Sequence, residues 1–386
     1  MNPATRRLGA TLTLGLGLSL TGCTGTINRT IKKRILPEAL SWQDLELSCT
    51  FGQAAVGLLQ PVGKEPADVA MILGWLPAGV CAEMAAWDAR RDEALVLRTH
   101  GGPADRKIAA SNDAAYRAER AFALAATRYD RAYQHWALRY GDVEDCSKLR
   151  DEDQQVYLLG LLSGALSLVA DASAKGAAGI PQNRLLDVAR ATECLDDERF
   201  FHIPTAVRGA AWATIPGTAP EGVDPWAVLT EAAEKGDALG QSIPRSLLVF
   251  TSSNAGKEDA FTSAIEGFSE LQPFTPKGAT PDGSGATPRT EWALMDAYGW
   301  ALSLYEADLV WIREEGHRAP SLGELPTTAE AGDDDPFGAG DPFGGDDPFG
   351  SDGSGEDDAS PTDPADPQTP PEDDAAAPGP DAGETP

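Results

Sequence analysis

The chain has 386 residues, of which 31 are Lys or Arg and 60 are Asp or Glu, so its formal net charge at pH 7 is -29. From Ala319 to Pro386 there are 19 acidic residues and no Lys or Arg, so the rest of the chain carries a net charge of -10. Binding to nucleic acid requires a basic surface for the phosphates, so this composition argues against nucleic acid as a partner.

Residues 1–22 have the organisation of a secretory signal peptide. Arg6 and Arg7 precede an apolar run from Leu8 to Leu20, which is shorter than the roughly 20 residues needed to span a bilayer. The segment Leu20-Thr21-Gly22-Cys23 resembles a bacterial lipobox, where cleavage precedes the cysteine and the new N-terminal residue carries lipid. We therefore predict lipidation at Cys23; the alternative is an ordinary signal peptide in which Cys23 has no role.

Residues 23–36 would then form a lipidated tether in front of the folded part. Thr24 is not the Asp that commonly retains lipoproteins in the inner membrane, so we expect the periplasmic face of the outer membrane. Basic side chains of the tether would be attracted to anionic headgroups, unless the segment is only a polar linker: Arg29, Lys32, Lys33 and Arg34. The protein is thus predicted to be anchored by lipid in the bacterial cell envelope.

From Pro37 onward the spacing of apolar residues is helical. A first helix is predicted from Pro37 to Pro61, with one apolar stripe formed by Leu45, Cys49, Val56 and Leu59. A second spans residues 66–99, and Pro77 is expected to kink or split it. Further helices are predicted over residues 105–140, 156–174, 182–194, 205–214, 225–239, 244–253, 256–271 and 290–315.

The helix over residues 105–140 carries aromatic side chains at helical spacing, namely Phe122, Tyr129, Tyr133, Trp136 and Tyr140. Such a stripe is more often part of a hydrophobic core than of a binding site. The polar tips of Tyr and Trp nevertheless suit the rim of a cleft. We therefore name Tyr129, Tyr133 and Trp136 as candidate ligand-binding residues.

The helix over residues 156–174 is apolar on nearly every side, which predicts the buried centre of a helical protein. Gly160 and Gly164 are four residues apart, so a neighbouring backbone is expected to approach closely there. Asp171 and the acidic residues before the helix favour a soluble core over a membrane span.

Four cysteines follow Cys23, and three pairings of them are possible. We favour Cys49–Cys81 and Cys146–Cys194, because each bond would join neighbouring helices of an antiparallel array. The alternative is four buried thiols. No Cys-x-x-Cys pair is present, so the sequence favours neither a zinc site nor thioredoxin-like chemistry.

These patterns predict an all-α protein in which residues 37–316 form an array of antiparallel helical hairpins. Residues 317–386 are predicted to be a disordered acidic tail, because their composition cannot bury enough apolar surface. Asp-Pro-Phe-Gly recurs there at residues 335–338, 341–344 and 347–350. These repeats either provide weak multivalent docking or belong to a solvated tail without a binding role.

Catalytic motifs are missing from the sequence: it has no metalloprotease, nucleophile-elbow, phosphate-loop or dinucleotide signature. Its four histidines, His100, His135, His202 and His317, are scattered and none has a second His at the spacing of a metal site. We expect no enzymatic activity, no metal and no cofactor, and we interpret His135 as a half-buried polar residue.

The order of features resembles the TatT component family of tripartite ATP-independent periplasmic (TRAP) transporters. After the lipobox and the first hairpin, the resemblance rests on Ala118-Glu-Arg-Ala-Phe122, Tyr157-Leu-Leu-Gly-Leu-Leu-Ser-Gly-Ala165, Gly209-Ala-Ala-Trp212, Val228-Leu-Thr-Glu-Ala-Ala-Glu234 and Glu291-Trp-Ala-Leu-Met-Asp-Ala-Tyr298. It covers roughly residues 23–311. The four extra cysteines, the loop over residues 273–288 and the acidic tail depart from the family pattern.

The resemblance implies an all-helical lipoprotein with tetratricopeptide-like hairpins that assembles as a homotrimer. Such a protein would bind the periplasmic solute-binding protein of a transporter and would hold a small, partly apolar ligand in an internal cleft. The alternative is a tetratricopeptide-like scaffold of the cell envelope that binds other proteins and no small molecule.

Overall fold

The computed structural model describes residues 29–59, 68–98, 102–141, 143, 145–271 and 292–326. Within these ranges the chain forms helices and no strand, which confirms the all-α prediction. The signal peptide, Cys23 and the Asp-Pro-Phe-Gly repeats lie outside the described residues. The helices are η1 (Ile31–Ile35), α3 (Leu36–Leu40), α4 (Leu45–Leu59), α5 (Asp68–Arg98), α6 (Ala104–Tyr140), η3 (Cys146–Lys148), α7 (Asp151–Ser173), α8 (Arg184–Ala191), α9 (Ile203–Thr214), α10 (Pro225–Ala238), α11 (Ile243–Ala255), α12 (Glu258–Glu266), η4 (Gly267–Glu270) and α13 (Ala293–Glu315).

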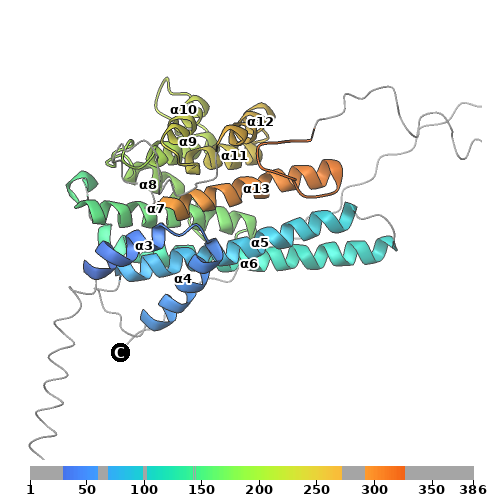
Figure 1. Cartoon of the computed structure of the whole chain (residues 1–386), viewed down its shortest axis with the longest axis horizontal. Coiled ribbons are helices and arrows are strands. Elements are labelled where there is room, and N and C mark those ends of the chain that lie inside the picture. Colours follow the sequence, from blue (N-terminus) through green and yellow to red (C-terminus); the bar gives the residue numbers. More distant parts are fainter. Residues whose placement is uncertain are drawn as a thin grey trace, which may run out of the picture. The chain divides into compact units, whose positions relative to one another are not determined.

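Most helices that follow one another in the chain pack side by side (Figure 1). The long helices α5 and α6 form the largest hairpin, with α4 against α5 and α7 against α6. Helices α9 to α12 form a second group of neighbours, and α13 packs on both α5 and α11. Helix α13 contributes Tyr298 and Leu302 to the larger hydrophobic core and Ala307 to the smaller one, so it joins the two groups.

The first predicted helix is in fact two helices, because the chain turns at residues 41–44. The Ser41 hydroxyl donates to the carbonyl of Glu38 at 2.7 Å, which ends α3. The backbone N–H of Leu47 donates to the Asp44 carboxylate at 2.9 Å, which is the arrangement of a helix N-cap for α4. Local side-chain hydrogen bonds therefore interrupt a helix that the apolar stripe alone predicted to be continuous.

The folded part also begins earlier than the predicted boundary at residue 37. Residues 31–35 are helical, and both Ile31 and Lys32 are buried. The Lys32 ammonium lies 2.7 Å from the carboxylate of Asp153 on α7, and Arg150 and Tyr140 also donate to that carboxylate. A buried cation with such a partner belongs to the fold, so the predicted tether over residues 23–36 is too long at its C-terminal end.

The other boundary moves as well, because residues 317–326 return along α13. The backbone N–H of Ala319 donates to Asp308 at 2.9 Å, and the Trp311 indole donates to the carbonyl of Glu324 at 3.0 Å. Leu322 and Leu325 pack against the smaller core. Because these apolar side chains are partly buried, residues 317–326 belong to the fold. The predicted tail over residues 317–386 therefore begins about ten residues too early.

Helix α5 is continuous through Pro77, so of the expected kink or split the split does not occur. The Pro77 ring packs against α4 at Gly52. An added Cβ on Gly52 would lie 2.9 Å from this ring and 2.8 Å from the carbonyl oxygen of Gly74. Beyond the proline, the Arg128 guanidinium on α6 donates to the carbonyl of Ala78 at 2.6 Å. Packing on both sides thus holds a helix that a lone proline would destabilise.

The glycines of α7 receive aromatic side chains from α6. An added Cβ on Gly160 would lie 2.5 Å from the Trp136 side chain, and one on Gly164 would overlap the Tyr133 ring. Gly79 on α5 receives the Tyr129 ring in the same way. The missing side chains of Gly160 and Gly164 make room for the aromatic stripe of α6, which packs closely on α7 there.

Replacing Gly160 by Ala should lower the free energy of unfolding by about 1–3 kcal/mol, because the new methyl group overlaps Trp136 in a packed core. The matched control is Gly57→Ala on α4, where an added Cβ meets nothing within 4 Å. That variant should be stabilised by up to about 1 kcal/mol through helix propensity. Urea denaturation of both variants measures the effects, and a Gly160→Ala protein as stable as the wild type would contradict this packing.

Both favoured disulfides are present. Cys49–Cys81 joins α4 to α5, which are neighbouring helices as predicted. Cys146–Cys194 instead joins the short helix η3 to the turn after α8, so it links two connections rather than two long helices. The first bond holds α4 beside α5. The second holds η3, which precedes α7, beside the turn after α8.

Helices α5 and α7 are long and apolar enough to cross a membrane by length and composition, yet 67% and 72% of their apolar windows are buried inside the protein. Leu158, Leu159 and Leu161 of α7 are fully buried. The central core helix predicted over residues 156–174 is thus confirmed, and the apolar character of both helices is explained by their burial.

Candidate functional site: an apolar pocket beside the first helices

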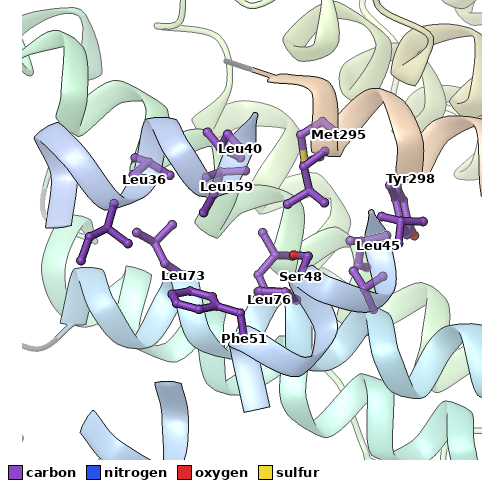
Figure 2. Close-up of a pocket in the computed structure, with 16 residues that line it drawn as sticks. Leu36, Leu40, Leu45, Ser48, Phe51, Leu73, Leu76, Leu159, Met295 and Tyr298 are labelled. Carbon is purple, nitrogen blue, oxygen red and sulfur yellow. The ribbon is translucent and has the colours of Figure 1, made fainter. Parts of the chain in front are cut away.

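An apolar pocket lies among α3, α4, α5, α7 and α13 (Figure 2). The space free of atoms amounts to about 700 Å³ including the open mouth, and about 60 Å³ of it is wide enough for the centre of a water molecule. Among the described residues that line it, only Ser48 and Tyr298 carry polar side-chain atoms. The lining residues are Ile35, Leu36, Ala39, Leu40, Leu45, Ser48, Phe51, Leu73, Leu76, Pro77, Val80, Leu159, Leu166, Leu294, Met295 and Tyr298.

The turn between α3 and α4 builds this pocket. Helix α3 contributes Leu36 and Leu40, and α4 contributes Leu45 and Phe51 (Figure 2). If α3 and α4 formed one straight helix, their apolar side chains would follow a single stripe. The turn at residues 41–44 lets both helices direct apolar side chains toward α5 and α13.

Tyr298 links the pocket to a buried carboxyl group behind it. Its hydroxyl donates to Glu83 on α5 at 2.9 Å, and the Tyr129 hydroxyl donates to the same carboxyl oxygen at 2.6 Å. Burial raises the pKa of Glu83 to about 7, although the two tyrosine hydrogen bonds act in the opposite direction. Burial also raises the pKa of both tyrosines well above the usual value, so they stay neutral donors.

The polar atoms of this group are therefore directed away from the pocket. The Tyr298 ring lines it, but the hydroxyl is engaged by Glu83, and Glu83 itself is not a lining residue. A molecule in the pocket would meet hydrocarbon, aromatic carbon and the hydroxyl of Ser48. This arrangement suits a ligand without charge or strong polarity in its bound part.

A second buried carboxyl group lies further along the interface of α13 with α5 and α11. Glu306 accepts a hydrogen bond from the Ser253 hydroxyl at 2.7 Å, and burial raises its pKa to about 7. Nearby, the Arg91 guanidinium lies 2.7 Å from the Asp308 carboxylate and 5.3 Å from the centre of the Tyr305 ring. These groups stabilise the contact between helices, and none of them lines the apolar pocket.

The three residues named from the sequence do not line the pocket. Tyr129 is fully buried against Gly79, and Trp136 is buried against Gly160. Tyr133 is half-buried, with the Arg184 guanidinium 4.3 Å from the centre of its ring. Their roles here are in helix packing, in line with the core interpretation of the stripe, and ligand binding by them stays a prediction.

The residues that line the pocket carry no distinguishing pattern in the sequence and were not predicted from it. Leu73 and Leu76 belong to the apolar face of α5, and nothing in that face distinguishes a pocket wall from a filled core. A sequence feature that does point to this region is Glu83, which lies in an otherwise apolar stretch of α5 from Val69 to Met84. A carboxyl group inside such a stretch indicates a buried polar contact between helices.

A second cleft, of mixed polarity, lies between α8, α9 and the loop after α9, and is lined by Leu186, Ala189, Arg190, Glu193, Trp212, Thr218 and Pro220. Its charged side chains are exposed, and it shares no residue with the apolar pocket. In the described ranges, no group of three or more His, Cys, Asp or Glu could hold a metal ion. His135 is half-buried and lies 2.8 Å from Asp68.

No family model matches this chain, and no curated protein or solved structure matches it either.

Proposed function

We propose that this protein is a non-enzymatic lipoprotein of the bacterial cell envelope that binds an unbranched hydrocarbon chain in the apolar pocket. The observation that carries the proposal is the chemistry of the wall, where Ser48 and Tyr298 are the only polar side chains among the described lining residues. Burial of apolar surface is the main driving force available in such a site.

The size of the pocket limits how much of an apolar ligand it can hold. About 60 Å³ is wide enough for the centre of a water molecule, and the free space with its open mouth is about 700 Å³. Since one water needs about 10–15 Å³ on this measure, the pocket has room for about four to six groups of that size, which is a short stretch of hydrocarbon. Each methylene group that leaves water contributes about 0.8 kcal/mol.

Ala39→Trp should prevent binding, because Ala39 lines the pocket and an indole at this position would fill it. The matched control is Ala54→Trp on α4, where Ala54 is exposed and outside the pocket. The probe is cis-parinaric acid, a linear fluorescent fatty acid, titrated into the full mature chain carrying Cys23→Ser. We expect one equivalent to bind to the parent and to the control, with affinity at least about tenfold weaker for Ala39→Trp.

Circular dichroism and thermal melting show whether Ala39→Trp is folded. Equal affinity of a folded Ala39→Trp protein and its parent would contradict binding in this pocket. Absence of binding to the parent would overturn the proposed ligand class and favour the scaffold alternative.

The proposed physiological context is solute uptake through a TRAP-type transporter, from the outer membrane's periplasmic face. This part of the proposal is supported by the resemblance in feature order and by the helical hairpin fold. The partner would be a periplasmic solute-binding protein, and the assembly would be a homotrimer. Native mass spectrometry of the protein from its own host tests the assembly: a trimer supports this context, and a monomer without any bound partner contradicts it.

A further inference from the structure

We propose that the hydrocarbon chain in the pocket is an acyl chain carried by Cys23 of the same molecule. This inference rests on the proposed function, since it requires a pocket that accepts such a chain. It differs from the proposed function in naming the source: the ligand would be covalently attached to the protein that binds it.

The chain enters the described structure beside the pocket. Ile35, Leu36, Ala39 and Leu40 line one wall, and they follow Cys23 closely in the sequence. Five residues separate Cys23 from Arg29, the first described residue. The six Cα–Cα steps from Cys23 to Arg29 could reach at most about 20 Å, and an acyl chain adds its own length to that distance.

The start of the described chain is held in place by contacts with α7. Lys32 is 6% exposed and lies 2.7 Å from Asp153, whose carboxylate also accepts hydrogen bonds from Arg150. Lys33 forms a second ion pair with Glu152 at 3.2 Å. These contacts fix η1 against α7, so the segment that leads to Cys23 starts from a defined point next to the pocket.

Ile35 marks where an acyl chain would enter. It lines the pocket, yet 41% of its surface is exposed to solvent, so the apolar wall continues to the protein surface beside η1. An exposed apolar residue at the mouth would be covered by a chain that arrives from the N-terminal side. The bound part of that chain is uncharged, as is the wall that receives it.

An acyl chain held in the pocket would change how the protein is anchored in the membrane. Stable attachment to a membrane requires two hydrophobic signals, whereas a single acyl chain gives only reversible binding. A lipoprotein that keeps one of its chains in its own pocket therefore has fewer chains in the bilayer. Occupation of the pocket and attachment to the membrane would then compete for the same chain.

The four other cysteines form two disulfides, so in the oxidised mature chain Cys23 offers the only thiol for labelling. N-hexadecylmaleimide can then attach one saturated chain at this residue without any membrane. The matched control is the same protein labelled with N-ethylmaleimide. Binding of cis-parinaric acid and sedimentation velocity are measured for both, and for the Cys23→Ser protein.

We expect the hexadecyl-labelled protein to keep the oligomeric state of the ethyl-labelled control and to bind cis-parinaric acid at least about tenfold more weakly than that control. Equal binding by the two labelled proteins would overturn the self-occupation while leaving the proposed ligand class intact. A blocked pocket in an assembly larger than that of the ethyl-labelled control would overturn it as well, because the chain would then occupy a second copy. If the Cys23→Ser protein does not bind the probe, the proposed function itself fails.

Discussion

Replacing Glu83 by Gln should make the protein more stable than the wild type at pH 8 and should leave its stability near pH 4.5 almost unchanged. Glu83 is buried and is held by the hydroxyls of Tyr129 and Tyr298. Burial raises its pKa from 4.5 to about 7. The glutamine amide is close in shape to the protonated carboxyl group and carries no charge at any pH.

The direction of the pH effect follows from proton binding. Between about pH 4.5 and pH 7 the unfolded chain has lost the Glu83 proton, whereas the folded protein still holds it. The free energy of unfolding therefore falls as pH rises through this window, by about 3 kcal/mol for a shift of this size. The stabilisation of the protonated form is fully present below about pH 4.5 and is lost above about pH 7.

Urea denaturation of the wild type and Glu83→Gln at several pH values measures this effect. The free energy of unfolding should fall more steeply with pH for the wild type than for Glu83→Gln. Glu306→Gln should remove a second contribution of the same sign to the pH dependence of the free energy of unfolding, because burial raises the pKa of Glu306 to about 7 as well. Glu266→Gln, at an exposed position of α12, is the control and should leave the pH dependence unchanged. Parallel pH profiles for the wild type and Glu83→Gln would contradict a protonated Glu83 in the core.

Removing the Cys146–Cys194 disulfide by a double change to Ala should lower the free energy of unfolding by about 4 kcal/mol. The two cysteines are 48 residues apart, so the bond strongly restricts the unfolded chain. Cys49–Cys81 closes a separation of 32 residues and should contribute nearly as much in the same loop-entropy argument. Urea denaturation of the oxidised proteins measures both effects.

The two disulfides differ in their expected effect on the pocket. Cys49–Cys81 holds α4, which contributes Leu45, Ser48 and Phe51 to the wall, so its removal should also weaken binding of cis-parinaric acid. Cys146–Cys194 lies outside the pocket and should affect stability alone. Reduced wild-type protein serves as the control for both variants. A double variant within about 1 kcal/mol of the wild type would contradict the stabilising role.

Local sequence signals predicted most helices, because each depends on nearby residues. The helix predicted over residues 105–140 is α6, and Gly141 ends it as expected, with its N–H donating to the carbonyl of Ala137 at 2.9 Å. The pair Cys49–Cys81 followed from the expectation of antiparallel neighbours, which is itself a consequence of short connections between helices, whereas Cys146–Cys194 joins two connections. An error arose where local signals competed, at the turn before Asp44 that divides the first predicted helix.

Local sequence signals could not predict the candidate site. The aromatic stripe of α6 identified a packed face, but only the positions of Gly79, Gly160 and Gly164 on other helices decide that these rings fill the core. Glu83 stands out in an apolar helix, yet the tyrosines that hold it come from α6 and α13, the second of them 215 residues away. Contacts between such distant residues leave no periodicity in the sequence.

The sequence by itself determined the helical class, the approximate extent of the long helices and the separation of an acidic tail from the rest, and it favoured the cysteine pairs that the structure contains. Each of these depends on composition or on the spacing of residues close together in the chain. The tertiary structure alone decided that Lys32 is buried, that residues 317–326 belong to the fold, and that α3, α4, α5 and α13 leave an apolar pocket between them. A pocket is space left over by packing, so it depends on how side chains from separate helices fit together rather than on any one helix.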